Sequence, residues 1–323
     1  MLSEEQIEII EKYISSFPYL SKDKTARLIL EKEKEKFPTI NNHRHFREVM
    51  TKHLSEKVLK HFEEQGNIKW NVPDSLYQEY EQEILPTSLN NILILSDMHI
   101  PFYCRRSIQA AIKHGEERGI NCIILNGDII DFYGLSRFVK DKKLRSVKRE
   151  LDMAKEFLGY LREKFPNVEI YFKTGNHEDR WKHYLWNNAD DISDLKELEL
   201  ETVLRIKEKR IKFIDDKRPI KAGKLFILHG HELFLSGAVN VARTIRLKTN
   251  ENTLFGHFHK TQDDFTTTLS NKTIGSFSTG ALCGLHPLYM PINNWNNGFA
   301  RIEIIQDGNF CVHNKKILNG EIR

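Results

Sequence analysis

Residues 91–99 read Asn-Ile-Leu-Ile-Leu-Ser-Asp-Met-His, a run of four large apolar residues that is soon followed by Asp97 and His99. An apolar run without alternation is typical of a strand that is buried on both faces of a sheet. Side chains along an extended segment repeat every two residues, so Asp97 and His99 are expected on the same face. The stretch therefore predicts a core strand that ends in two side chains of the type that bind metal ions.

The same arrangement occurs four more times along the chain. Further apolar runs, each followed by Asp, Asn or His, lie at 122–125, 168–172, 225–228 and 253–255. The polar segments that follow them are Asn126-Gly127-Asp128 with Asp131 one turn later, Gly175-Asn176-His177-Glu178, His229-Gly230-His231 and Gly256-His257-Phe258-His259. Ligand sites in α/β folds form where strand ends meet, so we expect the five loops to converge on one site.

Helical patterns separate these runs and indicate an α/β domain over residues 87–323. They lie at about 106–118, 146–164, 178–186 and 238–247. Two later β-type runs, 299–305 and 310–313, flank Asp307-Gly308 and predict a hairpin near the end of the domain.

Residues 1–86 have a different character and predict a small all-α N-terminal domain. Ser3 and Gln6 have the spacing of a capping box, Ser21 is suited to cap a second helix, and a third helical pattern covers about 42–64. Three short helices are the size of a helix-turn-helix module. The segment carries 13 Lys/Arg against 16 Asp/Glu, and this net negative charge disfavours non-specific binding to nucleic-acid phosphates.

The composition of the 323 residues is that of a globular protein, with 40% hydrophobic and 29% charged residues. No apolar run approaches the roughly 18–20 residues of a membrane span, so no membrane partner is expected. The first residues are acidic and lack the basic and apolar regions of a signal peptide, so we expect a cytoplasmic protein. The four cysteines are scattered and show no Cys-x-x-Cys spacing, which disfavours a disulfide framework or a zinc ribbon.

The residue types at the five loops indicate a particular chemistry. Imidazole and carboxylate ligands without thiolate suit Zn, Mn or Fe. If one Asp bridges, the loops hold enough ligands for two ions, and such pairs catalyse phosphoester hydrolysis by binding phosphate oxygens and lowering the pKa of a bridging water. His177 is then left over as a proton donor for the departing alkoxide.

In order and spacing, the five motifs resemble those of the calcineurin-like metallophosphoesterase superfamily, and most of all the stand-alone enzymes of phage and prophage type. The resemblance covers about residues 91–322. It implies a fold of two packed mixed sheets flanked by helices, with the site at the strand ends. It further implies one metal held by Asp97, His99 and His259, a second held by Asn176, His229 and His257, and Asp128 as the bridge. His177 takes the place of the catalytic histidine of that superfamily, and Asp131 that of the acid that orients it.

One departure from the superfamily pattern bears on the substrate. In the phosphoprotein phosphatase branch an Arg follows the acid matched by Asp131, whereas this chain has Phe132. This disfavours a Ser/Thr protein phosphatase and favours the phosphodiesterase and nuclease-like branches. Arg180, one helical turn after His177, is a candidate for binding the substrate phosphate. His231 is a second candidate contact, although an ordinary polar loop residue is the favoured interpretation.

Two other features have both a functional and a structural interpretation. The basic run from Arg137 to Arg149 is either a track for a polyanion or a solvated helix face. Trp295, which lies in a loop of asparagines, is suited equally to stacking on a substrate base or to anchoring the core.

The leading hypothesis is a dinuclear, metal-dependent hydrolase that cleaves phosphodiester bonds of a nucleotide or nucleic acid. In this hypothesis a metal-bridging hydroxide attacks and His177 acts as the general acid. Manganese is the expected metal, with Zn, Fe, Ni or Mg as alternatives. The alternatives are a phosphomonoesterase acting on small metabolites or proteins, and a non-catalytic binding protein that keeps the fold.

Overall fold

The computed structural model describes residues 2–17, 20–40, 42–53, 81–137, 141, 143–235 and 237–323. The chain forms two compact units, residues 1–78 and 79–323, and each is described here by itself. The short strand β1 (Glu83–Ile84) pairs in parallel with β6 (Ile220–Ala222). Residues 83–84 therefore belong to the second unit, and the division falls a few residues before the boundary predicted at 86/87, because backbone pairing rather than local pattern decides where this segment packs.

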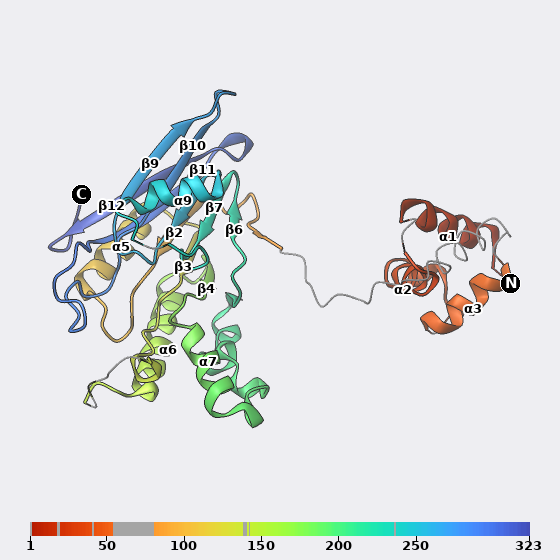
Figure 1. The fold of residues 1–323 in the computed structure, drawn as a ribbon, viewed down its shortest axis with the longest axis horizontal. Helices are drawn as coiled ribbons and strands as arrows, with labels where there is room; N and C mark the ends of the chain where they lie inside the picture. Colours follow the sequence, from red (N-terminus) through yellow and green to blue (C-terminus); the bar gives the residue numbers. More distant parts are fainter. Residues whose placement is uncertain are drawn as a thin grey trace. The chain divides into compact units, whose positions relative to one another are not determined.

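The N-terminal unit contains three α-helices within its described residues, α1 (Glu4–Ser16), α2 (Lys22–Lys32) and α3 (His43–His53) (Figure 1). The predicted capping box is present, since Gln6 N donates to Ser3 Oγ over 3.3 Å and Ser3 N donates to Gln6 Oε1 over 3.0 Å. A separate apolar core holds the helices together, with Ile10, Ile29 and Phe46 fully buried. The part of the third predicted helix beyond His53 lies outside the described residues.

The second unit is built on two sheets. Within the described residues the first has the strand order β1-β6-β7-β8-β10-β9 and the second has the order β13-β12-β11-β2-β3-β4-β5. The bounds of the first sheet beyond β1 and β6 are β7 (Leu225–Leu228), β8 (Thr253–Phe255), β9 (Gln262–Thr267) and β10 (Thr273–Ser278). Those of the second are β2 (Asn91–Leu95), β3 (Cys122–Asn126), β4 (Glu169–Lys173), β5 (Ile211–Ile214), β11 (Asn297–Ile304), β12 (Phe310–Leu318) and β13 (Glu321–Ile322).

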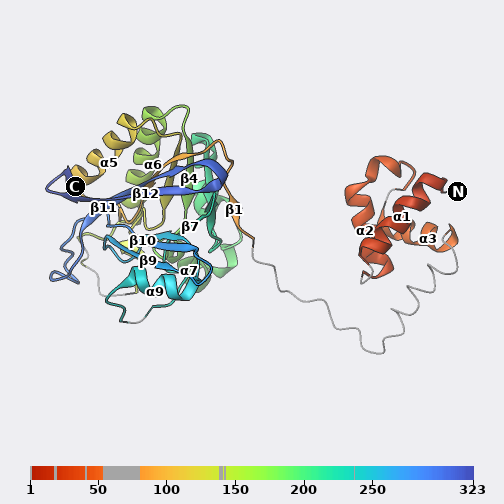
Figure 2. The same ribbon diagram turned by 90° about the horizontal axis from the view of Figure 1, so that it is seen from above.

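Helices cover the outer faces of the two sheets. Figure 2 shows α5 (Arg105–Glu117) and α6 (Val147–Lys164) on the outer side of one sheet and α9 (Val241–Thr249) on the outer side of the other. The remaining α-helices of the described residues in this unit are α7 (Asp179–Asn188) and the single-turn α8 (Leu200–Val203). No helix in the part of the chain that the structure describes has the length and apolarity needed to span a membrane.

The first apolar stretch explains this layered arrangement. Ile92 and Ile94 of β2 pack in the core between the two sheets, whereas Leu93 and Leu95 pack in the core beneath α5 and α6. Each large side chain buried in this way contributes roughly 1.5–3 kcal/mol. The unbroken apolar run thus reflects a strand that is buried on both faces, and the predicted class of two packed sheets flanked by helices is confirmed.

Strand direction places the polar loops together. β2, β3, β4 and β5 are parallel neighbours, so the loops that follow them leave the sheet at the same edge. In the other sheet β7 and β8 are also parallel neighbours. The five predicted ligand loops follow β2, β3, β4, β7 and β8. Strands β5, β6, β9 and β10 were not predicted. β6 has only three residues, and β9 alternates between half-buried and exposed residues.

Candidate metal centre

Five of the seven predicted metal ligands have left-handed backbone conformations. Their φ angles are 55° at Asp97, 51° at His99, 52° at Asp128, 66° at His257 and 57° at His259. Residues other than glycine rarely adopt positive φ, and such strained positions concentrate at functional sites. The backbone therefore turns after β2, β3 and β8, and it is not extended at Asp97 and His99, so the strand periodicity expected for these two residues does not hold.

Asp97, His99 and His259 lie together. The Nε2 atoms of His99 and His259 are 3.2 Å apart, and His259 Nε2 is 3.2 Å from Asp97 Oδ1. Because His99 donates from Nδ1 to Asp131, its Nε2 carries a lone pair that faces the other imidazole. Two ligands at 2.0–2.1 Å from a tetrahedral ion are about 3.3 Å apart, so the spacing of these atoms fits a bound divalent cation. The buried thiol of Cys283, 3.9 Å from His259 Nδ1, adjoins the group and was not anticipated from the sequence.

Asn176, His229 and His257 share another property. Each has a buried polar atom that makes no hydrogen bond, namely Asn176 Oδ1, His229 Nε2 and His257 Nδ1. Buried polar atoms nearly always have partners, so unpaired acceptors on three neighbouring loops fit a cation. His229 Nδ1 donates to the carbonyl oxygen of Asn126 over 2.8 Å, so its Nε2, which faces Asp128, is the atom that can hold either a proton or a cation.

Asp128 lies between the two groups. Its Oδ2 is 3.3 Å from His229 Nε2 and 3.9 Å from His99 Nε2, and its Oδ1 accepts from the backbone N of His177 over 2.9 Å. The side chain is 2% exposed. This is the arrangement that a bridging carboxylate requires, and that role stays a prediction.

The charges of the centre shift its pKa values in opposite directions. Burial raises the pKa of Asp97, but His259 and His229 outweigh this and lower it to about 2. Burial lowers the pKa of His229, but Asp128 and Asp97 outweigh this and raise it to about 10. Burial and the charge of His229 lower the pKa of His257 to about 4. The carboxylates are therefore ionised, and they attract either protons on the imidazoles or metal cations in their place.

Asp131 contacts both His99 and His177. Its Oδ1 lies 2.8 Å from His99 Nδ1 and 3.1 Å from His177 Nδ1, and its backbone carbonyl also accepts from His177 Nδ1 over 2.8 Å. Arg180 donates to the same carbonyl over 2.8 Å, and its Nη2 lies 3.0 Å from His177 Nε2. Burial lowers the pKa of His177, but Asp128 and Asp131 raise it above its ordinary value. Asp131 is thus placed to orient a metal-ligand candidate as well as the predicted acid.

Glu178 was quoted in the sequence motif without a role, and the structure shows one. Its carboxylate accepts backbone N–H groups from Asp128, Ile129 and Ile130, each over 2.9 Å, and from Gly175 over 2.7 Å. Burial and the charge of Asp128 raise its pKa to about 7. Glu178 therefore joins the loop after β3 to the loop after β4. The sequence signal that could have indicated this role is the position of Glu178, an acidic residue at the start of a predicted helix.

The glycines beside the motifs are required by close packing. A Cβ atom at Gly175 would overlap Asp128 Oδ1, and one at Gly256 would lie 2.5 Å from Asp97 Oδ2. Real Cβ atoms do not approach other atoms so closely. The backbone at both positions must therefore be bare for the ligand loops to approach each other.

Other candidate residues lie around this centre. The ring of His231 is 5.2 Å from that of His229, and its Nε2 is 3.6 Å from Asp179 Oδ2. The ring of Trp295 lies 4.2 Å from that of His259, and the ring of Tyr289, which is largely exposed, is 6.5 Å from Trp295.

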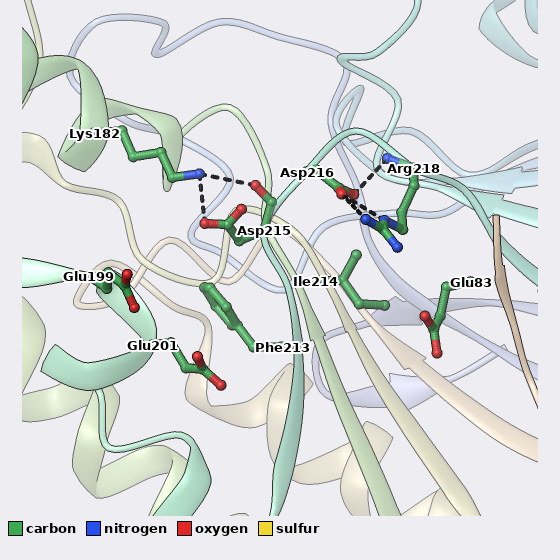
Figure 3. A pocket seen from close by; sticks show the side chains of 9 residues that line it. All are labelled: Glu83, Lys182, Glu199, Glu201, Phe213, Ile214, Asp215, Asp216 and Arg218. Carbon is green, nitrogen blue, oxygen red and sulfur yellow. Dashed lines mark hydrogen bonds and ion pairs between the residues drawn. The ribbon is translucent and has the colours of Figure 1, made fainter. Parts of the chain in front are cut away.

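Two cavities among the described residues are lined by none of the predicted site residues. One has a volume of about 500 Å³ and is lined by five carboxylates, of which Lys182 pairs with Asp215 and Arg218 with Asp216 (Figure 3). Its negative charge opposes binding of an anionic phosphoester. The other, of about 580 Å³, lies against residues 85–90 and 304–308. The cluster of His and Asp residues is therefore the better candidate for a phosphoester site.

Comparison with known families identifies the family of the chain. Residues 91–276 match the model of the calcineurin-like phosphoesterase family, and the chain belongs to this family. Membership supports a metal-dependent hydrolase, and the chain carries His and Asp groups that could bind metal ions.

Several solved structures are similar. A single-mutant form of Vps29 from Entamoeba histolytica is 14% identical with a TM-score of 0.38, over 72% of this chain and 96% of that one. Vps29 from Cryptosporidium parvum is 14% identical with a TM-score of 0.38, and the match covers 72% of this chain and 94% of that one. YfcE, a phosphoesterase from E. coli, is 13% identical with a TM-score of 0.32, and the match covers 69% of this chain and 98% of that one. No curated protein sequence matches the chain.

Proposed function

We propose that the protein is a dinuclear metal-dependent phosphodiesterase that acts on a nucleotide or nucleic acid, of the stand-alone phage or prophage type. The observation that carries this proposal is the pair of buried ligand groups on either side of Asp128. Two divalent cations, with manganese the first choice, supply charge neutralisation of the phosphate and activation of water when bound.

The residues of the chain divide this work between them. Asp97, His99 and His259 would hold one ion and Asn176, His229 and His257 the other, with Asp128 between the two groups. His177 gives a proton to the leaving oxygen from Nε2, and Asp131 orients its ring through Nδ1. The guanidinium of Arg180 lies 3.0 Å from His177 Nε2, so a phosphate beside that nitrogen is within its reach.

The surroundings of Asp131 favour a diester over a monoester. Phe132 is fully buried, and its ring stacks on that of Trp181 with the ring centroids 5.9 Å apart. This position therefore supplies no positive charge to the substrate. A monoester carries more negative charge than a diester and needs more cationic partners. Arg180 suits the single charge of a diester.

Aromatic and basic side chains favour a nucleotide or nucleic-acid substrate. Trp295 lies against His259, and Tyr289 lies near it, so a base attached to the bound phosphate has an aromatic surface to stack on. Beyond Asp131, the described residues Lys143, Arg145, Lys148 and Arg149 are exposed and supply positive charge for a longer polyanion. Lys140 and Lys142 of the predicted basic run lie outside the described residues.

Hydrolysis of bis-p-nitrophenyl phosphate and of p-nitrophenyl phosphate with added Mn²⁺ tests the proposal. We expect turnover of the diester to exceed that of the monoester, and a chelator to abolish both. Preferential hydrolysis of the monoester would replace the proposal with a phosphatase. A protein that binds Mn²⁺ but hydrolyses neither substrate would replace it with a binding protein that keeps the fold.

A further inference from the structure

A fully buried ion pair lies behind the loop that carries His229. The Nζ atom of Lys173 is 3.1 Å from Glu232 Oε1, and the two side chains are 0% and 7% exposed. Lys173 also donates to the carbonyl oxygens of Asp216 over 3.3 Å and Arg218 over 2.9 Å. The three protons of the ammonium therefore all have acceptors, so its position is well defined.

The carboxylate of Glu232 is directed at a predicted metal ligand. Its Oε1 accepts from the backbone N of His229 over 3.0 Å, and its Oε2 accepts from Gly230 N over 2.6 Å. The ring of His229 is held separately by the carbonyl oxygen of Asn126. Backbone and ring of His229 are thus fixed independently, and the carboxylate fixes the backbone.

The ion pair also connects two ligand loops. Lys173 is the last residue of β4, three residues before Asn176, and Glu232 lies three residues after His229. Asn176 and His229 are both assigned to the same metal position. A displacement of either loop would therefore change the same ligand set.

Stability alone does not account for this pair. A buried ion pair can often be replaced by apolar side chains of similar volume without loss of stability, because the desolvation of two charges offsets their attraction. What an apolar pair cannot supply is the acceptor for the two backbone N–H groups of the His229 loop.

We propose that Lys173 and Glu232 are positioning residues that set the metal affinity of the Asn176–His229–His257 position and leave that of the Asp97–His99–His259 position unchanged. This inference rests on the ligand assignment of the proposed function. Its test reads metal binding, so it does not depend on which substrate is hydrolysed.

The test compares two double variants of the full chain by calorimetric titration of the metal-free protein with Mn²⁺. In Lys173→Met/Glu232→Met the acceptor is absent, and we expect one of two binding events to weaken by about 10–100-fold while the other is unchanged. The electron paramagnetic resonance signal of a coupled Mn²⁺ pair should give way to that of isolated Mn²⁺. In Lys173→Gln/Glu232→Gln the amide oxygen introduced at the second position can still accept a backbone N–H, so affinity should recover towards the wild-type value.

The matched control is Arg301→Met/Glu303→Met. This removes another ion pair with a buried cation, at the opposite edge of the sheet, where Glu303 pairs in register with Asn91 at the start of β2. It should leave both binding events unchanged. Wild-type binding of both ions by the Lys173→Met/Glu232→Met variant, or equal weakening of both events, would overturn the positioning role. A wild-type protein that binds no ion would instead overturn the proposed function.

Discussion

Asp128 lies between the two ligand groups of the centre. It contacts imidazoles of both ligand groups through Oδ2 and the backbone of His177 through Oδ1. Burial raises its pKa, but His177 and His229 outweigh this, and its pKa lies well below the ordinary value. The centre therefore keeps a negative charge between the two ligand groups at every pH at which the protein is expected to work.

Asp128→Asn should abolish metal-dependent activity. The amide retains the shape and can still accept from His177 N, but it removes the charge between the two groups, so fewer than two ions should bind. Metal content after dialysis and the rate with bis-p-nitrophenyl phosphate measure this. Asp263→Asn, which alters a carboxylate on β9 that accepts from Asn314, is the control. A variant with two bound ions and the wild-type rate would contradict the dinuclear assignment.

His177→Ala tests the proton donor. Loss of a general acid costs about 10²–10⁴ in rate, and the cost should be largest for alkoxide leaving groups. With p-nitrophenolate, which leaves without a proton, the loss should be smaller. Metal content should be retained, because the hydrogen bond from residue 177 to Asp128 is made by the backbone N–H. Equal losses on the two kinds of substrate would remove His177 from this role.

At the scale of secondary-structure elements, buried carboxylates hold loops through backbone N–H groups. Glu178 holds the loops after β3 and β4, and Glu232 holds the loop after β7. Glu150 of α6 likewise accepts from Tyr133 N over 3.0 Å and Gly134 N over 3.1 Å in η2 (Tyr133–Leu135), the turn that follows Asp131. The position of the site thus depends on how α6 and α7 pack as well as on the sheet.

Glu150→Gln should remove one pH dependence of stability. Burial raises the pKa of Glu150 to about 7, above the value of an unfolded chain. The folded state therefore binds more protons between pH 4.5 and 7, and its stability falls by roughly 3 kcal/mol as the pH rises through this window.

Urea unfolding of the metal-free protein at several pH values measures this slope. The free energy of unfolding of wild type should fall relative to that of Glu150→Gln between pH 4.5 and 7. Glu156→Gln, at an exposed position of the same helix, should match wild type. A Glu150→Gln variant with the wild-type pH profile would contradict the assignment.

At the scale of the whole molecule, charge is distributed unevenly. The centre is rich in carboxylates and imidazoles, while the exposed residues at the start of α6 are basic. Lys148 is paired with Asp152 of the same helix in an exposed i,i+4 contact, which contributes little to stability. These lysines and arginines therefore remain available to an anionic polymer.

Lys143→Gln/Arg145→Gln/Lys148→Gln should reduce the salt dependence of oligonucleotide binding. On single strands, each phosphate contact adds about −0.7 to the slope of log binding constant against log salt concentration. The variant should therefore show a shallower slope and a higher KM for the oligonucleotide. KM for bis-p-nitrophenyl phosphate should stay unchanged, because a small diester contacts only the centre. If both substrates responded equally, or neither did, these residues would be a solvated helix face and a small nucleotide the better substrate class.

Much of this organisation was predictable from local sequence. The apolar runs of β2, β3, β4, β7 and β8 stand out because strands buried on both faces consist mostly of apolar residues. The ligand candidates at their ends stand out for the opposite reason, since Asp, Asn and His directly after a core strand need a partner. Local pattern also predicted the capped helices of the N-terminal unit, because capping involves residues only three positions apart.

Tertiary structure decided the contacts between loops that are distant in the chain. Three such contacts depend on which strands are neighbours. Asp131 contacts His99 as well as His177, and Glu178 accepts from Asp128 N although the two are 50 residues apart. Lys173 pairs with Glu232 behind His229. Strands β5, β6, β9 and β10 are likewise defined by their pairing partners. The physical reason is that burial and hydrogen bonding are satisfied across the sheet edge, and no local pattern records which distant groups meet there.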